Sequence, residues 1–234
     1  LLEFGEDLGF IGHKVLSPPA TLHQFAPWRH AAIADWSNQE AGRIAATLNR
    51  LGEILVFREG QLLFARRGGI WHFLTHQPVV RQMAVPKDKG IRQAIYETAI
   101  DAAFARTGAC IGVTSSESTN RWEQVVAETD RITSPSSAKS KAIAQIVQGK
   151  TFQSLDRTLR QELVAIDGAT VLDHKGNILA VGAILKFKGG SIGGGRTAAA
   201  RELGELGLGL KISQDGGITG FRSIAKDGVA FRVM

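Results

Sequence analysis

The chain has 234 residues, 44% of them apolar and 21% charged, which suits a globular protein with one large domain or a core domain and a smaller companion. No apolar run approaches the roughly 20 residues of a membrane-crossing helix, and the single cysteine, Cys110, excludes an internal disulfide and a multi-cysteine metal site. No secretion signal is recognisable, so we expect a cytoplasmic protein that does not bind membranes. The net charge of +6 comes from scattered residues, which favours a solvated basic surface over attraction to nucleotides or nucleic acid, although composition alone does not decide between them.

The first 90 residues predict a smaller α+β portion whose role the sequence does not reveal. Residues 1–30 contain three prolines and are expected to be irregular. Apolar residues at helical spacing predict a helix over residues 31–51. Two β-rich runs joined by a short glycine-containing turn predict a hairpin over residues 53–65, and residues 70–74 could add a third strand. The polar stretch 86–90 is the expected junction with the rest of the chain.

Residues 91–234 predict an α/β domain in which helices flank a mixed central sheet, because helical and strand patterns alternate along this part of the chain. The expected helices cover residues 91–107, 121–129, 140–147, 152–164 and 197–206. The expected strands cover residues 109–113, 169–172, 178–185, 209–213, 218–221 and 228–233.

One acidic residue, Asp167, lies between a predicted helix and a predicted strand, and Gly168 and Ala169 follow it. An Asp-Gly pair at such a place is commonly a simple turn. A carboxylate beside a strand can also hold a divalent metal ion. The sequence alone leaves both interpretations open.

A glycine-rich block precedes the predicted helix 197–206. The stretch Gly190–Thr197 matches the phosphate-binding P-loop pattern except that Arg196 replaces its lysine. Too little chain follows for a complete P-loop domain, so we do not favour one. Backbone N–H groups of such a block, placed at a helix start, can hold phosphate. A structural glycine loop without a ligand is the alternative.

Four blocks taken together resemble the diadenylate cyclase domain, the nucleotide-binding part of the DNA integrity scanning proteins. They are Thr107–Ile111, Asp167–Ala169, Gly193–Ala199 and Ser213–Gly217, and the resemblance spans roughly residues 91–221. In that family two domains meet face to face, each holding one ATP, and form cyclic di-AMP with the help of a divalent metal. The resemblance therefore implies a nucleotidyltransferase that uses ATP with Mg²⁺ or Mn²⁺ and acts as a homo-oligomer.

Site residues follow from the resemblance position by position. It implies that Asp167 holds the metal and helps to activate the 3′-hydroxyl, which makes it the catalytic residue. The implied nucleotide-binding residues are Gly168, Ala169, Gly193, Gly194, Gly195, Arg196, Thr197 and Ser213.

The chain departs from the family pattern at three positions. The family has Arg and His where this chain has Gly195 and Arg196, and the usual acid after Ser213 is Gln214. One lost charge-assisted phosphate contact costs roughly 1.5–3 kcal/mol. Two hypotheses follow: an active cyclase, or a domain of the same fold that senses a nucleotide or cyclic dinucleotide without turning it over.

Other residues give weaker signals. His72 and His76 have a spacing that suits a metal pair on a helix, but the apolar residues around them favour a strand or a hydrophobic segment. We expect Cys110 to be a buried apolar residue rather than a nucleophile. The hairpin 53–65 could form a dimer contact or a regulatory surface.

Overall fold

The computed structural model describes residues 1–19, 22–118, 121–186, 194–223 and 226–234. The chain folds into two compact units, Leu1–Leu74 and Thr75–Met234. The segment between residues 75 and 90, which the sequence assigns to the N-terminal portion, belongs to the second compact unit because its helix packs against later elements of that unit. None of the helices within these ranges is long and apolar enough to cross a membrane.

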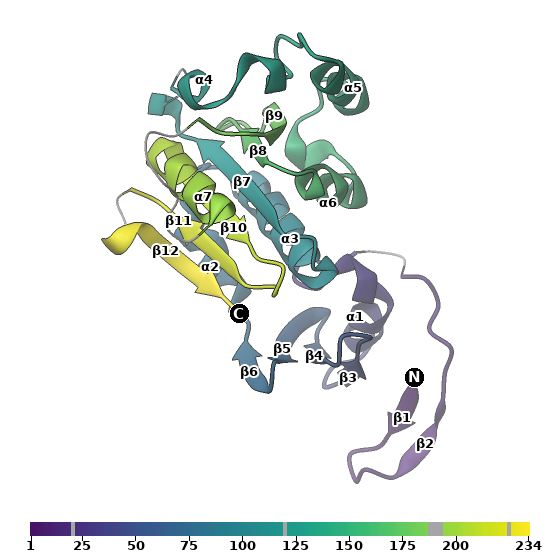
Figure 1. The fold of residues 1–234 in the computed structure, drawn as a ribbon. Coiled ribbons are helices and arrows are strands. Elements are labelled where there is room, and N and C mark those ends of the chain that lie inside the picture. The colour runs from purple at the N-terminus through teal and green to yellow at the C-terminus, as the bar shows by residue number, and fades with distance from the viewer. Residues whose placement is uncertain (20–21, 119–120, 187–193, 224–225) are drawn as a thin grey trace. The chain divides into compact units, whose positions relative to one another are not determined.

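In its described residues the first unit contains two antiparallel sheets, one α-helix and a short 3-10 helix; Figure 1 shows their arrangement. A two-stranded hairpin consists of β1 (Leu2–Phe4) and β2 (Phe10–His13). After the short 3-10 helix η1 (Trp28–His30) come α1 (Ala31–Asn38) and a four-stranded meander of β3 (Ile44–Leu48), β4 (Ile54–Arg58), β5 (Gln61–Arg67) and β6 (Ile70–Phe73). One face of the meander packs on α1, with Leu55, Phe57, Leu62 and Ala65 fully buried.

Two expectations for this unit are wrong. The predicted helix 31–51 ends at Asn38, because a turn with Gly42 at φ +84° redirects the chain into β3. The apolar residues Ile44 and Leu48, which fit a helical face, instead share one face of a strand that lies outside the core. Residues 1–30, expected to be irregular, contain β1 and β2. The predicted hairpin 53–65 and the strand after it correspond to β4, β5 and β6.

The second unit contains the helices α2 (His76–Met83), α3 (Lys89–Ala105), α4 (Trp122–Val125), α5 (Ala138–Val147), α6 (Arg157–Ala165) and α7 (Gly195–Leu206). Short 3-10 helices are η2 (Ser116–Ser118), η3 (Glu128–Asp130), η4 (Phe152–Ser154) and η5 (Lys226–Gly228). Its strands are β7 (Ala109–Thr114), β8 (Ala169–Leu172), β9 (Ile178–Ala183), β10 (Gly207–Ile212), β11 (Ile218–Phe221) and β12 (Val229–Val233).

These strands form one mixed six-stranded sheet in the order β12-β11-β10-β7-β8-β9. Only the β7–β8 pair is parallel among them. Helix α7 packs against β7, β10 and β11, and α3 lies on the other face of the sheet (Figure 1). Every residue of β7, β8 and β9 is buried, as both faces of the sheet require. The expected fold class, a mixed central sheet flanked by helices with a smaller α+β portion, is confirmed.

Two glycines bring α7 very close to this sheet. A Cβ on Gly209 of β10 would lie 1.8 Å from the carbonyl oxygen of Ala200, and a Cβ on Gly112 of β7 would lie 2.6 Å from Leu203 Cδ2. Helix and strands therefore approach almost backbone to backbone at this crossing. The crossing fixes the position of the first turn of α7 relative to the ends of the strands.

Candidate functional site

Three of the sequence blocks lie at one end of the six-stranded sheet. Parallel pairing places Cys110 of β7 opposite Ala169 of β8, so the residues that precede the two strands are neighbours. Antiparallel pairing places Ile212, the last residue of β10, opposite Ala109. Gly108, Asp167 and Ser213 consequently occupy adjacent strand ends.

The start of α7 reaches the same end of the sheet. A Cβ on Gly108 would lie 3.1 Å from Arg196 Cζ and 3.2 Å from Gln214 Cγ, so the guanidinium lies over the residue before β7. Ala199 belongs to the same buried apolar cluster as Cys110 and Ala169. The fourth sequence block thus joins the other three.

The first turn of α7 is open to an anion. Its N-cap, Gly194, has no side chain to bond the first N–H groups, and its φ of +84° suits glycine. The helix dipole places partial positive charge at this end. Gly194, Gly195 and Arg196 are exposed and Thr197 is half-buried. The neighbouring Gly193 lies outside the described residues.

Asp167 is exposed and sits in the short bend between α6 and β8. Within the described ranges its carboxylate makes no hydrogen bond or salt bridge. The next residue, Gly168, has φ +109°, and a Cβ there would lie 2.5 Å from the backbone carbon of Gly182. Close packing against β9 therefore explains why residue 168 is a glycine. The same packing fixes the backbone next to Asp167.

A second polar cluster supports this bend from β9, and the sequence analysis missed it. Lys139 Nζ donates to the carbonyl oxygen of Gly182 at 2.8 Å and pairs with the carboxylate of Asp130. Asp130 Oδ2 in turn accepts from the N–H of Ile184 at 3.1 Å. The only sequence signal was the isolated Gly182 in an apolar strand, which indicates a close backbone approach.

Ser213 and Gln214 begin the tight turn between β10 and β11. The N–H of Ser213 donates to the carbonyl oxygen of Gly217 at 2.8 Å, and the N–H of Gly217 donates to Asp215 Oδ1 at 3.1 Å. Arg106, at the end of α3, donates to the carbonyl oxygen of Gln214 at 3.3 Å. Two guanidinium groups, those of Arg106 and Arg196, therefore flank this turn, and the first was not recognised in the sequence.

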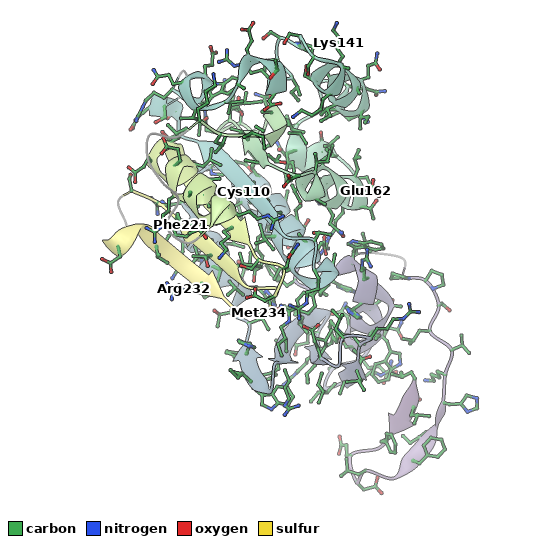
Figure 2. The ribbon with its side chains drawn as sticks, viewed as in Figure 1. Cys110, Lys141, Glu162, Phe221, Arg232 and Met234 are labelled. Atoms are coloured by element: carbon green, nitrogen blue, oxygen red, sulfur yellow. The ribbon has the colours of Figure 1, made fainter. Side chains whose placement is uncertain are left out.

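Cys110 lies on the central strand β7 (Figure 2) and is fully buried. Burial raises the pKa of its thiol to about 12, although the nearby positive charge of Arg196 acts in the opposite direction. The thiol therefore stays protonated at neutral pH and is a poor nucleophile. Its place in the apolar cluster agrees with the expected packing role.

The described residues contain no group of three or more His, Cys, Asp or Glu side chains that could hold a metal ion. Magnesium needs no such protein cage when a nucleotide is present, because one or two carboxylates and the substrate's phosphates can bind it. A single exposed, unpaired Asp167 fits that mode of binding. His72 and His76 do not form a pair, since His72 lies in β6 while His76 is buried with Nδ1 2.8 Å from Tyr96 Oη.

No protein-family model matches the chain, and no curated protein matches it. Solved structures similar to it include DacA from Staphylococcus aureus, as a double mutant, with 16% sequence identity and a TM-score of 0.41. This alignment covers 63% of the present chain and 88% of the chain in that solved structure. Another is a hypothetical membrane spanning protein from Bacillus cereus, with 18% identity and a TM-score of 0.41 over 60% of this chain and 61% of that one. Likeness at this level does not identify the chemistry of the site.

Proposed function

We propose that the second unit is a diadenylate-cyclase-like nucleotidyltransferase that binds ATP at the sheet end formed by β7, β8, β10 and α7. The observation that carries the proposal is the meeting of all four sequence blocks at this one end. A structural glycine loop and a turn aspartate would have no reason to be neighbours. An exposed carboxylate beside a positively charged helix start is the arrangement that a metal-bound triphosphate requires.

In this proposal the triphosphate binds to the first turn of α7. The N–H groups of Gly194 and Gly195 point to the anion, and Arg196 supplies a planar cation that can bind two phosphate oxygens. Thr197 and Ser213 would contribute hydroxyl groups to the same site. Gly193 completes the glycine turn by sequence position alone, and Gly168 and Ala169 let the chain pass beside the nucleotide.

Asp167 is the proposed catalytic residue. Each reaction joins the 3′-oxygen of one ATP to the α-phosphorus of another; the hydroxyl proton is lost and pyrophosphate leaves. Two such steps give cyclic di-AMP and two pyrophosphates, which requires two chains with their sites face to face. Asp167 would orient the hydroxyl and hold Mg²⁺ or Mn²⁺, and the bound ion would stabilise the negative charge on the phosphate.

One observation favours a second function, a sensor that binds a nucleotide or cyclic dinucleotide without reaction. A Cβ on Gly195 would meet no atom of the described residues within 4 Å, so no described side chain fills the place where the family carries an arginine. Lacking that guanidinium costs about 1.5–3 kcal/mol of phosphate binding. The cation of Arg196 offsets part of the loss only if it can leave Gly108 for the phosphate.

Incubation with ATP and Mn²⁺, followed by mass spectrometry for cyclic di-AMP, tests the proposal. The wild-type chain should form product, Asp167→Asn should lower the yield at least about 100-fold, and melting temperatures should agree because Asp167 is exposed. Glu162→Gln, an exposed acid on α6 (Figure 2), is the matched control and should retain full activity.

The same experiment distinguishes the two functions. Absence of product from a wild-type chain that binds ATP in calorimetry would select the sensor. Absence of both product and nucleotide binding would refute the nucleotide site. Product formation that survives Asp167→Asn would remove the role given to that residue.

A further inference from the structure

The outer face of the sheet in the first unit is apolar and uncovered. One row across the four strands consists of Ala46, Val56, Phe64 and Phe73, and the next consists of Leu48, Ile54, Arg66 and Trp71. The exposed fractions of Leu48, Trp71 and Phe73 are 70%, 53% and 63%. We call these two rows, together with Ile44, the outer sheet face. Monomeric proteins rarely leave so continuous an apolar patch in water.

The same unit carries a second uncovered apolar surface, on the β1–β2 hairpin. Phe4 and Phe10 pair across it with their rings 5.7 Å apart in an edge-to-face arrangement. Leu2, Phe4, Phe10 and Ile11 are each more than half exposed. An isolated two-stranded hairpin is at best marginally stable in water, so it needs a surface to cover its apolar side.

Each of the two surfaces also carries a charged side chain without a salt bridge or hydrogen bond inside the described ranges. On the hairpin Glu3 pairs with Lys14 at 3.1 Å and Asp7 Oδ1 accepts from the N–H of Gly9, which leaves the carboxylate of Glu6. On the sheet Arg58 pairs with Glu59 at 3.2 Å, which leaves the cation of Arg66 on the outer sheet face. The acid of the hairpin and the cation of the sheet have opposite charges, as partners across an interface require.

We propose that the occupant of the outer sheet face is the β1–β2 hairpin of a second copy of this chain, in a two-fold dimer where each hairpin covers the other copy's sheet. Such a contact is self-complementary, as a two-fold interface must be. Between His13 and Trp28 the described residues contain no helix or strand. The hairpin also contacts its own unit through Glu3, whose carboxylate lies 4.0 Å from the guanidinium of Arg43.

The available area is sufficient for a stable dimer. Nine large apolar side chains are exposed on the two surfaces: Leu2, Phe4, Phe10, Ile11, Ile44, Leu48, Phe64, Trp71 and Phe73. At roughly half exposure and about 200 Å² each, they offer on the order of 900 Å² per copy, against about 800 Å² per partner in a standard interface.

The chemistry of the surface favours a protein over a single-stranded nucleic acid. Aromatic side chains on a sheet can stack on bases, but β3 and β4 present aliphatic groups. The unit also contains seven Lys and Arg against seven Asp and Glu, so it lacks the positive field that phosphate binding requires. The proposal does not depend on the nucleotide site, because none of its residues belongs to the second unit.

Light scattering of the full chain tests the proposal first. The wild-type protein should have twice the chain mass of 25.1 kDa at micromolar concentration. Phe10→Ser and Trp71→Ser should each weaken the dimer at least about tenfold, whereas Ile146→Ser, an apolar residue 52% exposed on α5, should not. A wild-type monomer, or a dimer that is insensitive to both substitutions, would overturn the proposal.

Cysteine cross-linking then identifies the occupant. Mixed chains bearing Phe10→Cys and Phe73→Cys separately should form a disulfide between copies, while Cys110 is buried and should not react. Ile146→Cys mixed with Phe73→Cys is the control and should give no link. A chain carrying both Phe10→Cys and Phe73→Cys that links within itself as a monomer would show that the hairpin covers its own sheet, which contradicts the exchange.

Discussion

The two larger sheets of this protein differ in how their apolar faces are covered. In the second unit every residue of β7 is buried, because α7 covers one face and α3 and α6 lie on the other. In the first unit β5 alternates between exposed Phe64 and buried Ala65, because α1 packs on one face of the meander while the other face is exposed in the described part of the unit. When both faces of a sheet are covered, the strand ends are the places left for a ligand, as in the proposed nucleotide site. When one face is exposed, that face can bind another protein, as in the proposed dimer contact.

The largest expected loss of stability comes from breaking the buried salt bridge between α3 and α6, the helices on one face of the covered sheet. Arg157 on α6 donates to Asp101 on α3 through Nε at 2.6 Å, and both side chains are almost fully buried. Asp101→Ala removes the carboxylate that pairs with this buried guanidinium, so the free energy of unfolding should fall by about 3–5 kcal/mol. Urea unfolding measures this change.

An exposed salt bridge is the control for that prediction. Glu123, which pairs with Arg131 at 3.2 Å, is 53% exposed. Glu123→Ala should cost at most about 1 kcal/mol. Equal losses for the two variants would mean that the α3–α6 pair is not buried as described.

Adding a single methyl group should also have different effects on stability in the two units. Gly209→Ala places a Cβ 1.8 Å from the carbonyl oxygen of Ala200, which forces α7 away from β10 and should cost about 3 kcal/mol in stability. A Cβ on Gly12, on β2 of the first unit, meets no described atom within 4 Å, so Gly12→Ala should leave the melting temperature unchanged within about 2 °C. A tolerated Gly209→Ala would contradict the close crossing that positions the start of α7.

Gly195→Arg sharpens the functional side of the comparison. A Cβ at this position meets no atom within 4 Å in the part of the chain that the structure describes, so the fold should be retained while a phosphate contact is gained. ATP affinity should rise about 10- to 100-fold, the equivalent of 1.5–3 kcal/mol. Calorimetry measures the affinity, and Gly195→Ala controls for the lost glycine. If Gly195→Arg binds ATP no more tightly than Gly195→Ala, the phosphates do not bind at this turn.

The smallest effect concerns acid stability in the first unit. Burial lowers the pKa of His30 below 6.5, and the charge of Glu53 opposes this only in part. The unfolded chain therefore binds a proton more readily, so the stability present above pH 6.5 is lost as the pH falls below that value.

Urea unfolding at pH 7.5 and pH 5 measures this dependence. His30→Asn should reduce the loss between the two pH values by up to about 1 kcal/mol. Substitution of the exposed His13 by Asn should leave the loss unchanged. A wild-type protein that gains stability on acidification would contradict the direction of the shift.

Local patterns predicted most of the second unit. Strands β8 and β11 have the predicted bounds, because short runs of mostly buried residues are bounded there by turn residues. Helix α2 was missed, since eight residues containing a proline give only a weak helical pattern. The predicted helix 152–164 divides into η4 and α6, with Asp156 capping the second by accepting from the N–H of Thr158.

The site was predictable only as separate blocks. Their order in the sequence does not show that β8 pairs in parallel with β7, and this pairing makes Asp167 a neighbour of Gly108. Arg106 and Lys139 were missed because each acts through a backbone carbonyl far away in sequence. The helix prediction for residues 31–51 failed partly because Ile44 and Leu48 are four residues apart, a spacing that also fits a helix. They lie on the exposed face of a strand, so their spacing does not reflect packing in a core.

Hydrogen exchange with and without ATP and Mg²⁺ tests the shared site most directly. The account predicts slower exchange of backbone N–H groups in four segments at once: 107–109, 167–169, 194–198 and 213–217. Protection confined to one of these segments, or located at the opposite ends of β7 and β8, would contradict the single site.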